Sequence, residues 1–144
     1  MATPVSEIAS VIQLAVAPVF LLAGIGAFIN AFSSRLARIV DRSRLLEERL
    51  GSTRESERDA ARREVRQLGR RARWIYLGIT LGVTSALFIC VLIVAAFVEH
   101  FFSLNLATAI GALFVLAMLA LVGALLAFLR EVFLAIRNLA IGRG

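Results

Sequence analysis

The chain is organised around SSRLARIVDRSRLLEERLGSTRESERDAARREVRQLGRRARW, residues 33–74, which separates two long apolar runs. This stretch holds thirteen of the sixteen arginines and seven of the ten acidic residues. Its excess of six positive charges equals the net charge of the whole chain. An arginine-rich loop between apolar runs indicates the cytoplasmic side of a membrane, because basic loops are retained there. The stretch therefore predicts a membrane topology, although it names no biochemical activity.

The composition of the chain is that of a membrane protein. Its 144 residues are 60% hydrophobic and have a mean hydropathy of +0.86. The basic charge does not require nucleic acid, because it lies on one loop and serves orientation and attraction to anionic lipids of the inner leaflet. Cys90 is the only cysteine and lies in an apolar run, so it indicates neither a disulfide framework nor a metal site. We expect it to be a small packing residue.

The apolar runs predict an all-α membrane protein with three transmembrane helices, its N-terminus outside and its C-terminus inside. About 20 apolar residues cross a bilayer, and each run is at least that long. After the third run, Arg130, Arg137 and Arg143 outnumber Glu131, which favours an inside C-terminus. The predicted segments are an outer N-terminus with transmembrane helix 1 (1–32), an arginine-rich cytoplasmic hairpin (33–73), transmembrane helix 2 (74–98), a short outer turn (99–105), transmembrane helix 3 (106–129) and a cytoplasmic C-terminus (130–144).

Residues 33–73 are predicted to form an antiparallel helical hairpin. Gly51 is expected to end the first arm, and Ser52 with Glu55 has the pattern of a capping box for the second, which places the turn near residues 51–53. Apolar residues recur at three-four spacing in both arms. A solvated, disordered loop is the alternative. The predicted seam comprises Leu36, Ile39, Leu46, Leu50, Ala61, Val65, Leu68 and Ala72.

The first predicted span carries a stripe of small and polar side chains at helical spacing. One interpretation is packing between subunits, because small residues let helices approach and amides bond across them. The other is that several copies line a pore with this face, since three spans are too few to enclose a path in one subunit. Either interpretation makes the protein a homo-oligomer. The candidate pore or packing residues are Ser6, Ser10, Gln13, Ala17, Pro18, Gly24, Ala27, Asn30 and Ser34.

The other two spans contain small residues at positions suited to close helix packing. Gly78 and Gly82 form a GxxxG pattern, and Ser85 extends the same face. Gly123 and Ala127 supply small positions in the third span. In a membrane helix this pattern indicates close approach of a neighbouring helix.

The run IASVIQLAVAPVFLLAGIGAFINAFSSRLARIVDRSR, residues 8–44, resembles a bacterial integral membrane family catalogued as domain of unknown function 2721. In that family, too, a first span with polar residues leads directly into an arginine-rich segment of the RLARIVDR type. The resemblance covers most of the chain and is most specific from Gln13 to Arg44. It implies a small integral membrane protein with three spans, which the positive-inside rule places in the bacterial inner (plasma) membrane. It implies no reaction.

No motif for catalysis, cofactor binding or metal binding is visible. No ionisable residue lies deep in a predicted span, so we expect no buried ion pair. There is no HExxH, no CxxC and no phosphate-binding glycine loop, and His100 is expected to be solvated on the outer turn. We therefore expect no enzyme. Two hypotheses remain: a homo-oligomeric channel for ions or small solutes lined by the first span, or a non-conducting scaffold whose hairpin binds a protein partner or anionic lipid.

Overall fold

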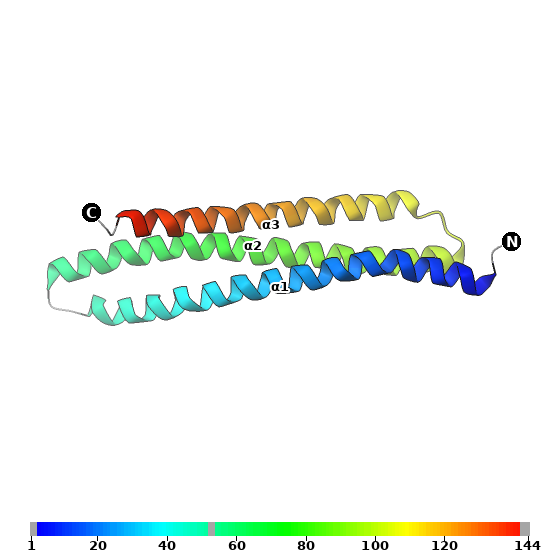
Figure 1. Cartoon of the computed structure of the whole chain (residues 1–144). Coiled ribbons are helices and arrows are strands. Elements are labelled where there is room, and N and C mark those ends of the chain that lie inside the picture. The colour runs from blue at the N-terminus through cyan, green and yellow to red at the C-terminus, as the bar shows by residue number, and fades with distance from the viewer. Residues whose placement is uncertain (1–2, 52–53, 142–144) are drawn as a thin grey trace. The chain divides into compact units, whose positions relative to one another are not determined.

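The computed structural model describes residues 3–51 and 54–141, which form three α-helices (Figure 1). They are α1 (Pro4–Leu50), α2 (Glu55–Phe102) and α3 (Ala107–Ile141), of 47, 48 and 35 residues. Each is long and apolar enough to cross a membrane, and at 1.5 Å per residue each exceeds a hydrocarbon core of about 30 Å. This indicates a multi-pass membrane protein and confirms the predicted all-helical chain. The limits of the spans and the sides of the termini remain predictions.

The end of α1 lies where the sequence places it, but its geometry differs from the expected one. The helix continues through Pro18 and ends at Leu50, immediately before Gly51. A helix-ending glycine usually adopts a left-handed conformation. Here the Gly51 amide donates to the Glu48 carbonyl at 3.3 Å, and no described glycine has a positive φ. Ser52 of the predicted capping box lies outside the described residues.

The link between α2 and α3 is closed by Glu99. Its carboxylate accepts a hydrogen bond from the Leu106 amide at 3.3 Å, just before α3 begins. Ser103 and Asn105, the polar residues of the turn itself, make no such bond within the described residues. Ser103 instead adopts a left-handed conformation, with φ of 52°, directly after α2 ends. The side chain of Glu99 is longer than those of Ser103 and Asn105 and extends from α2 to the start of α3. Neither of these two residues is therefore needed as a cap.

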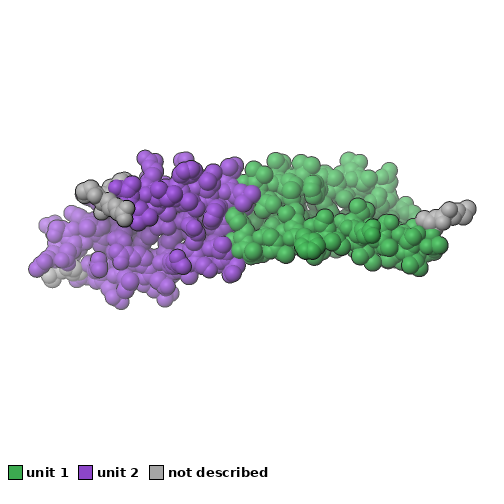
Figure 2. All heavy atoms as spheres, viewed as in Figure 1, with its two compact units in different colours: residues 1–29, 81–123 green, residues 30–80, 124–144 purple. Residues whose placement is uncertain are grey.

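The helices contribute to two compact units, residues 1–29 with 81–123 and residues 30–80 with 124–144 (Figure 2). In unit 1, the first of these, the three helices meet at Ile25, Ile89 and Ala117, all buried. The buried Ser85 hydroxyl donates to the Ala117 carbonyl at 2.7 Å, which joins α2 to α3. Small residues bring backbones close in this unit. A Cβ on Gly82 would lie 3.3 Å from Ile29, and one on Gly123 would lie 3.0 Å from Leu81.

Unit 2 has a core built around Phe32 of α1. This side chain is fully buried, and its ring lies edge-on to that of Phe128 in α3, with centroids 5.3 Å apart. Gly78 of α2 lies against the same ring. The predicted packing residue Ala127 is also buried in this unit. Phe32 therefore contacts both other helices, and α2 can approach it only because residue 78 lacks a side chain.

We predict that Gly78→Ala destabilises the protein by about 1–3 kcal/mol, because an added methyl group overpacks a filled core. Its Cβ would lie 2.5 and 2.7 Å from Cζ and Cε2 of Phe32, which is held by Phe128 and cannot swing away. Gly69→Ala is the matched control on α2, since no atom lies within 4 Å of its Cβ. It should be neutral or stabilising by up to about 1 kcal/mol. Thermal unfolding in detergent measures both, and equal melting temperatures would contradict the packing argument.

Candidate functional site

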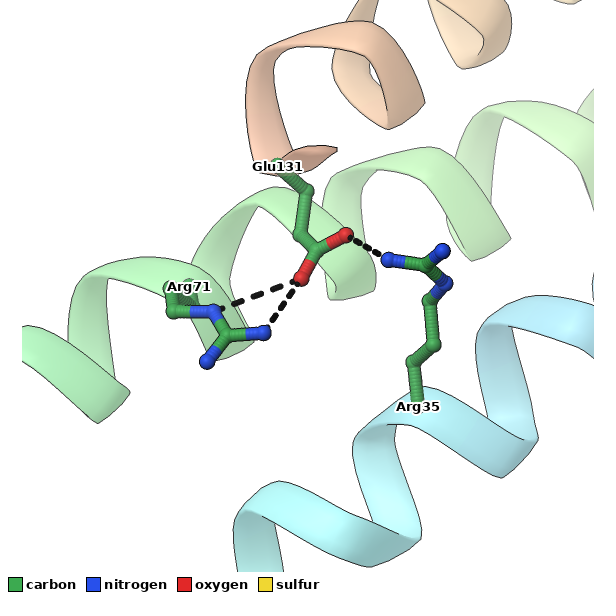
Figure 3. Close-up of polar contacts among 3 residues, drawn as sticks. All are labelled: Arg35, Arg71 and Glu131. Atoms are coloured by element: carbon green, nitrogen blue, oxygen red, sulfur yellow. Dashed lines mark hydrogen bonds and ion pairs between the residues drawn. The ribbon is translucent and has the colours of Figure 1, made fainter. Parts of the chain in front are cut away.

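A buried carboxylate joins the three helices of unit 2 (Figure 3). Glu131 of α3 has no exposed surface, and it lies between Arg35 of α1 and Arg71 of α2. Its Oε2 accepts a hydrogen bond from Nη1 of Arg35 at 2.7 Å. Its Oε1 accepts two from Arg71, from Nη2 at 2.9 Å and Nε at 3.3 Å. We call these three residues the Glu131 cluster.

The charges of the Glu131 cluster are arranged so that the buried one is the best satisfied. A buried ionised carboxylate costs several kcal/mol unless it is paired and hydrogen-bonded, and both oxygens of Glu131 are bonded to guanidinium groups. The arginine side chains are 38% and 24% exposed, so each keeps part of its hydration. The Arg35 guanidinium also lies 5.1 Å from the centre of the Phe128 ring. The cluster is therefore continuous with the aromatic core around Phe32.

The expectation that the chain has no buried ion pair was wrong. It considered only residues deep in the predicted spans, and Glu131 was placed in the cytoplasmic C-terminus, where it would be solvated. The helix continues without interruption past Glu131, and the register of α3 against α1 and α2 brings its carboxylate inside. A signal was present in the sequence: Glu131 is the only acidic residue after Glu99, and Val132, Phe133 and Leu134 follow it.

A second ion pair joins α1 to α2 in unit 2, at the surface. Nε of Arg42 donates to Oε1 of Glu64 at 2.8 Å, and the two side chains are 44% and 37% exposed. The bond to Glu64 and its negative charge raise the pKa of Arg42 above its ordinary value. Arg42 is thus a permanent cation. Beside this pair the predicted seam residues are all buried or half-buried: Leu36, Ile39, Leu46, Leu50, Ala61, Val65, Leu68 and Ala72.

The small and polar residues predicted in the first span lie on the outside of the chain. Gln13 is exposed, and its side chain has no hydrogen-bond partner among residues 3–51 and 54–141. The hydroxyls of Ser6 and Ser10 donate to backbone carbonyls one turn earlier, at 2.7 and 3.0 Å. Ser34, in unit 2, does the same with the Asn30 carbonyl at 3.1 Å. Ala17, Gly24, Ala27 and Asn30 are also exposed, whereas Pro18 is half-buried.

Unit 1 contains an apolar pocket of about 700 Å³ between its three helices. Its walls include Pro18 and Phe114, and Glu99 and His100 are the ionisable residues in its lining. The sequence placed His100 on a solvated turn, but it lies within α2 and is half-buried, with its ring against Phe101. Cys90 is exposed in the single chain, and its role as a small packing residue stays a prediction. Among the described residues, no group of three or more His, Cys, Asp or Glu side chains could hold a metal ion.

A protein-family model matches most of the chain. The sequence profile described as "Protein of unknown function (DUF2721)" matches residues 15–141, which include the whole Glu131 cluster. No curated protein and no solved structure matches the chain. The likeness inferred from residues 8–44 is therefore confirmed over most of the chain.

We predict that Glu131→Gln destabilises the protein strongly, because it leaves two guanidinium groups without their counter-charge. Breaking a buried ion pair costs about 3–5 kcal/mol, and the partial exposure of both arginines places this one at the lower end. Glu64→Gln is the matched control, since it removes the same carboxylate charge from the exposed ion pair with Arg42. It should lower the free energy of unfolding by about 0–1 kcal/mol. Thermal unfolding of the two variants in one detergent measures the difference. Equal losses would show that the cluster does not hold unit 2 together.

Proposed function

The chain belongs to the DUF2721 family of proteins of unknown function, and we propose that it is a homo-oligomeric membrane protein whose subunits meet on one face of α1. The observation that carries this proposal is the exposed amide of Gln13, which has no partner within the described residues. An amide facing hydrocarbon without a hydrogen bond costs several kcal/mol. A second copy of the chain, or water held between copies, satisfies it. We call Ser6, Ser10, Gln13, Ala17, Gly24 and Ala27 the α1 polar face.

Another exposed surface of α1 in unit 1 has a different character. Val5, Ile8, Ile12, Val16 and Val19 follow one another at helical spacing and are all exposed. Such a surface suits lipid chains, whereas the α1 polar face offers small side chains and one amide. The two surfaces lie on different sides of the helix, because they occupy different positions in the 3.6-residue repeat. We assign the first to lipid and the second to a neighbouring subunit.

The packing of the helices supports the choice of α1 for this interface. In the most apolar stretch of α1 only 6% of the residues are buried, against 22% in the corresponding stretches of α2 and α3. Gly24 has no atom within 4 Å of the position of a Cβ, so nothing inside the chain requires a glycine there. Glycine at such a position allows the backbone of a neighbouring helix to approach closely. In the proposed assembly, α1 gains from its neighbours the contacts that it lacks in one chain.

We further propose that the α1 polar face lines a path for ions or small solutes at the centre of the assembly. The N-terminus lies outside and the C-terminus inside in this proposal, since residues 33–73 carry the positive charge expected of a cytoplasmic hairpin. The same rule assigns the protein to the bacterial inner membrane. Gln13 then contributes a ring of uncharged amides near the outer end of the path.

A second candidate function is a non-conducting scaffold. It is favoured by the number of exposed arginines in unit 2, which would attract an acidic protein partner or anionic lipid. Neither candidate includes a chemical reaction, and we propose none. These exposed arginines include Arg38, Arg44, Arg62, Arg63, Arg66, Arg70 and Arg73.

We predict that Gly24→Leu reduces the oligomer to smaller species, because the new side chain holds the neighbouring helix away. Gly26→Leu is the control, since its Cβ position is equally open within the chain but lies on the other side of α1. Native mass spectrometry of protein released from detergent measures the subunit number of both variants. A wild-type protein that is monomeric, or two variants with the same subunit number, would contradict the proposed interface.

We predict that Gln13→Leu leaves the assembly intact, because Gly24 and the other small residues of the α1 polar face still let neighbouring helices pack. The flux of ions or small solutes should change, because a leucine removes the amide from the path. Gln67→Leu makes the same substitution at an exposed position of α2 outside the predicted spans. Flux is measured in liposomes with the proteins reconstituted at matched density. If wild type, Gln13→Leu and Gln67→Leu conduct equally, the α1 polar face does not line a conducting path.

A further inference from the structure

Unit 2 contains a small pocket between α1 and α2 whose lining is dominated by arginine. Its volume is about 340 Å³, and we call it the arginine pocket. Ile39 and Leu68 are buried beneath it, so its apolar part belongs to the core of the unit. The lining residues are Arg35, Arg38, Ile39, Arg42, Leu68 and Arg71.

The arginine pocket keeps an excess of positive charge after its ion pairs are counted. Glu131 is shared by Arg35 and Arg71, and Glu64 pairs with Arg42. Arg38 has no ion pair or hydrogen bond to an acidic residue in the described parts of the chain. Four guanidinium groups therefore face two carboxylates, which leaves two positive charges uncompensated. A pocket of this kind attracts an anion that can accept several N–H bonds at once.

The position of the arginine pocket along the helices indicates where that anion comes from. Arg35 lies three residues after Phe32, the predicted end of the first span, and Arg71 lies three residues before Trp74, the predicted start of the second. Trp74 is half-buried, and the Arg130 guanidinium lies 5.8 Å from its ring. Tryptophan beside arginine is typical of the membrane–water interface, where lipid headgroups lie. The pocket is thus at the height of the lipid phosphates in the predicted membrane.

We propose that the arginine pocket binds the phosphate group of an anionic phospholipid. Arg38 provides the uncompensated charge, and Arg35 and Arg71 are held in place by Glu131, so their remaining N–H groups are fixed before the lipid arrives. Basic pockets between membrane helices are a recognised form of headgroup site. This inference deepens the scaffold function proposed above and rests on its lipid-binding form. It does not depend on conduction.

Lipid binding to the detergent-solubilised full chain tests the proposal. Native mass spectrometry compares the retention of dioleoyl-phosphatidylglycerol with that of zwitterionic dioleoyl-phosphatidylcholine. Wild type should retain the anionic lipid preferentially, and Arg38→Gln should weaken that binding about tenfold, the loss expected of one charged hydrogen bond. Arg38 is chosen because it supports no ion pair, so the fold should survive. Arg73→Gln is the control: Arg73 is exposed, directly precedes Trp74 and does not line the pocket, so this variant should lose only the weak attraction of one surface charge, far less than tenfold.

Three outcomes would overturn the proposal. Unchanged binding in Arg38→Gln would place the lipid elsewhere, and equal losses in both variants would show attraction to the whole basic surface. Displacement of the lipid by millimolar inorganic phosphate would show that the pocket takes soluble anions instead. The subunit number in the same spectra reports separately on the proposed assembly, so failure of one proposal is distinguishable from failure of the other.

Discussion

The carboxylate of Glu131 is the constraint on which the structure of unit 2 depends. Close packing and polar contacts between helices determine the register in which the helices pack. Glu131 bonds to one arginine on each of the other two helices, and a shift of any helix by one turn would break one of these bonds and leave a charge buried. The aromatic contacts of Phe32 favour the same arrangement, because Phe128 packs on that ring and also lies beneath the Arg35 guanidinium.

The cluster also determines the charge of the surface around it. One carboxylate cannot neutralise two arginines, so the cluster that stabilises the interior of unit 2 keeps a net positive charge, carried by its partly exposed arginines. The exposed Arg42–Glu64 pair is balanced and adds no charge, whereas Arg38 adds one more. Pairing thus fixes the positions of Arg35, Arg42 and Arg71, but their two carboxylate partners leave one of the three positive charges uncompensated. A structural ion cluster and an anion-binding surface can be the same group of residues.

Local patterns in the sequence predicted what depends on neighbours along the chain. The apolar runs predicted three helices that can span a membrane, and the glycine at residue 51 marked the end of α1. Three-four spacing selected seam positions that are buried, such as Leu46 and Ala61. What could not be predicted depends on the register between helices: Glu131 is buried only because Arg35 and Arg71, 96 and 60 residues away, lie opposite it.

Ser85 and Gln13, both in unit 1, differ in whether a single chain supplies their hydrogen-bond partners. The Ser85 hydroxyl is buried and bonds to a carbonyl of α3, so one chain satisfies it completely. The hydroxyls of Ser6 and Ser10 are satisfied by backbone carbonyls one turn earlier, and only the Gln13 amide on the α1 polar face lacks a partner within the described residues. The α1 polar face therefore does not require a water-filled pore, because hydroxyls bonded to the backbone need no water. Amides that pair between subunits satisfy it equally well. The assembly is the part of the proposal that the unpaired amide demands, and conduction additionally requires that the amides stand far enough apart to hold water.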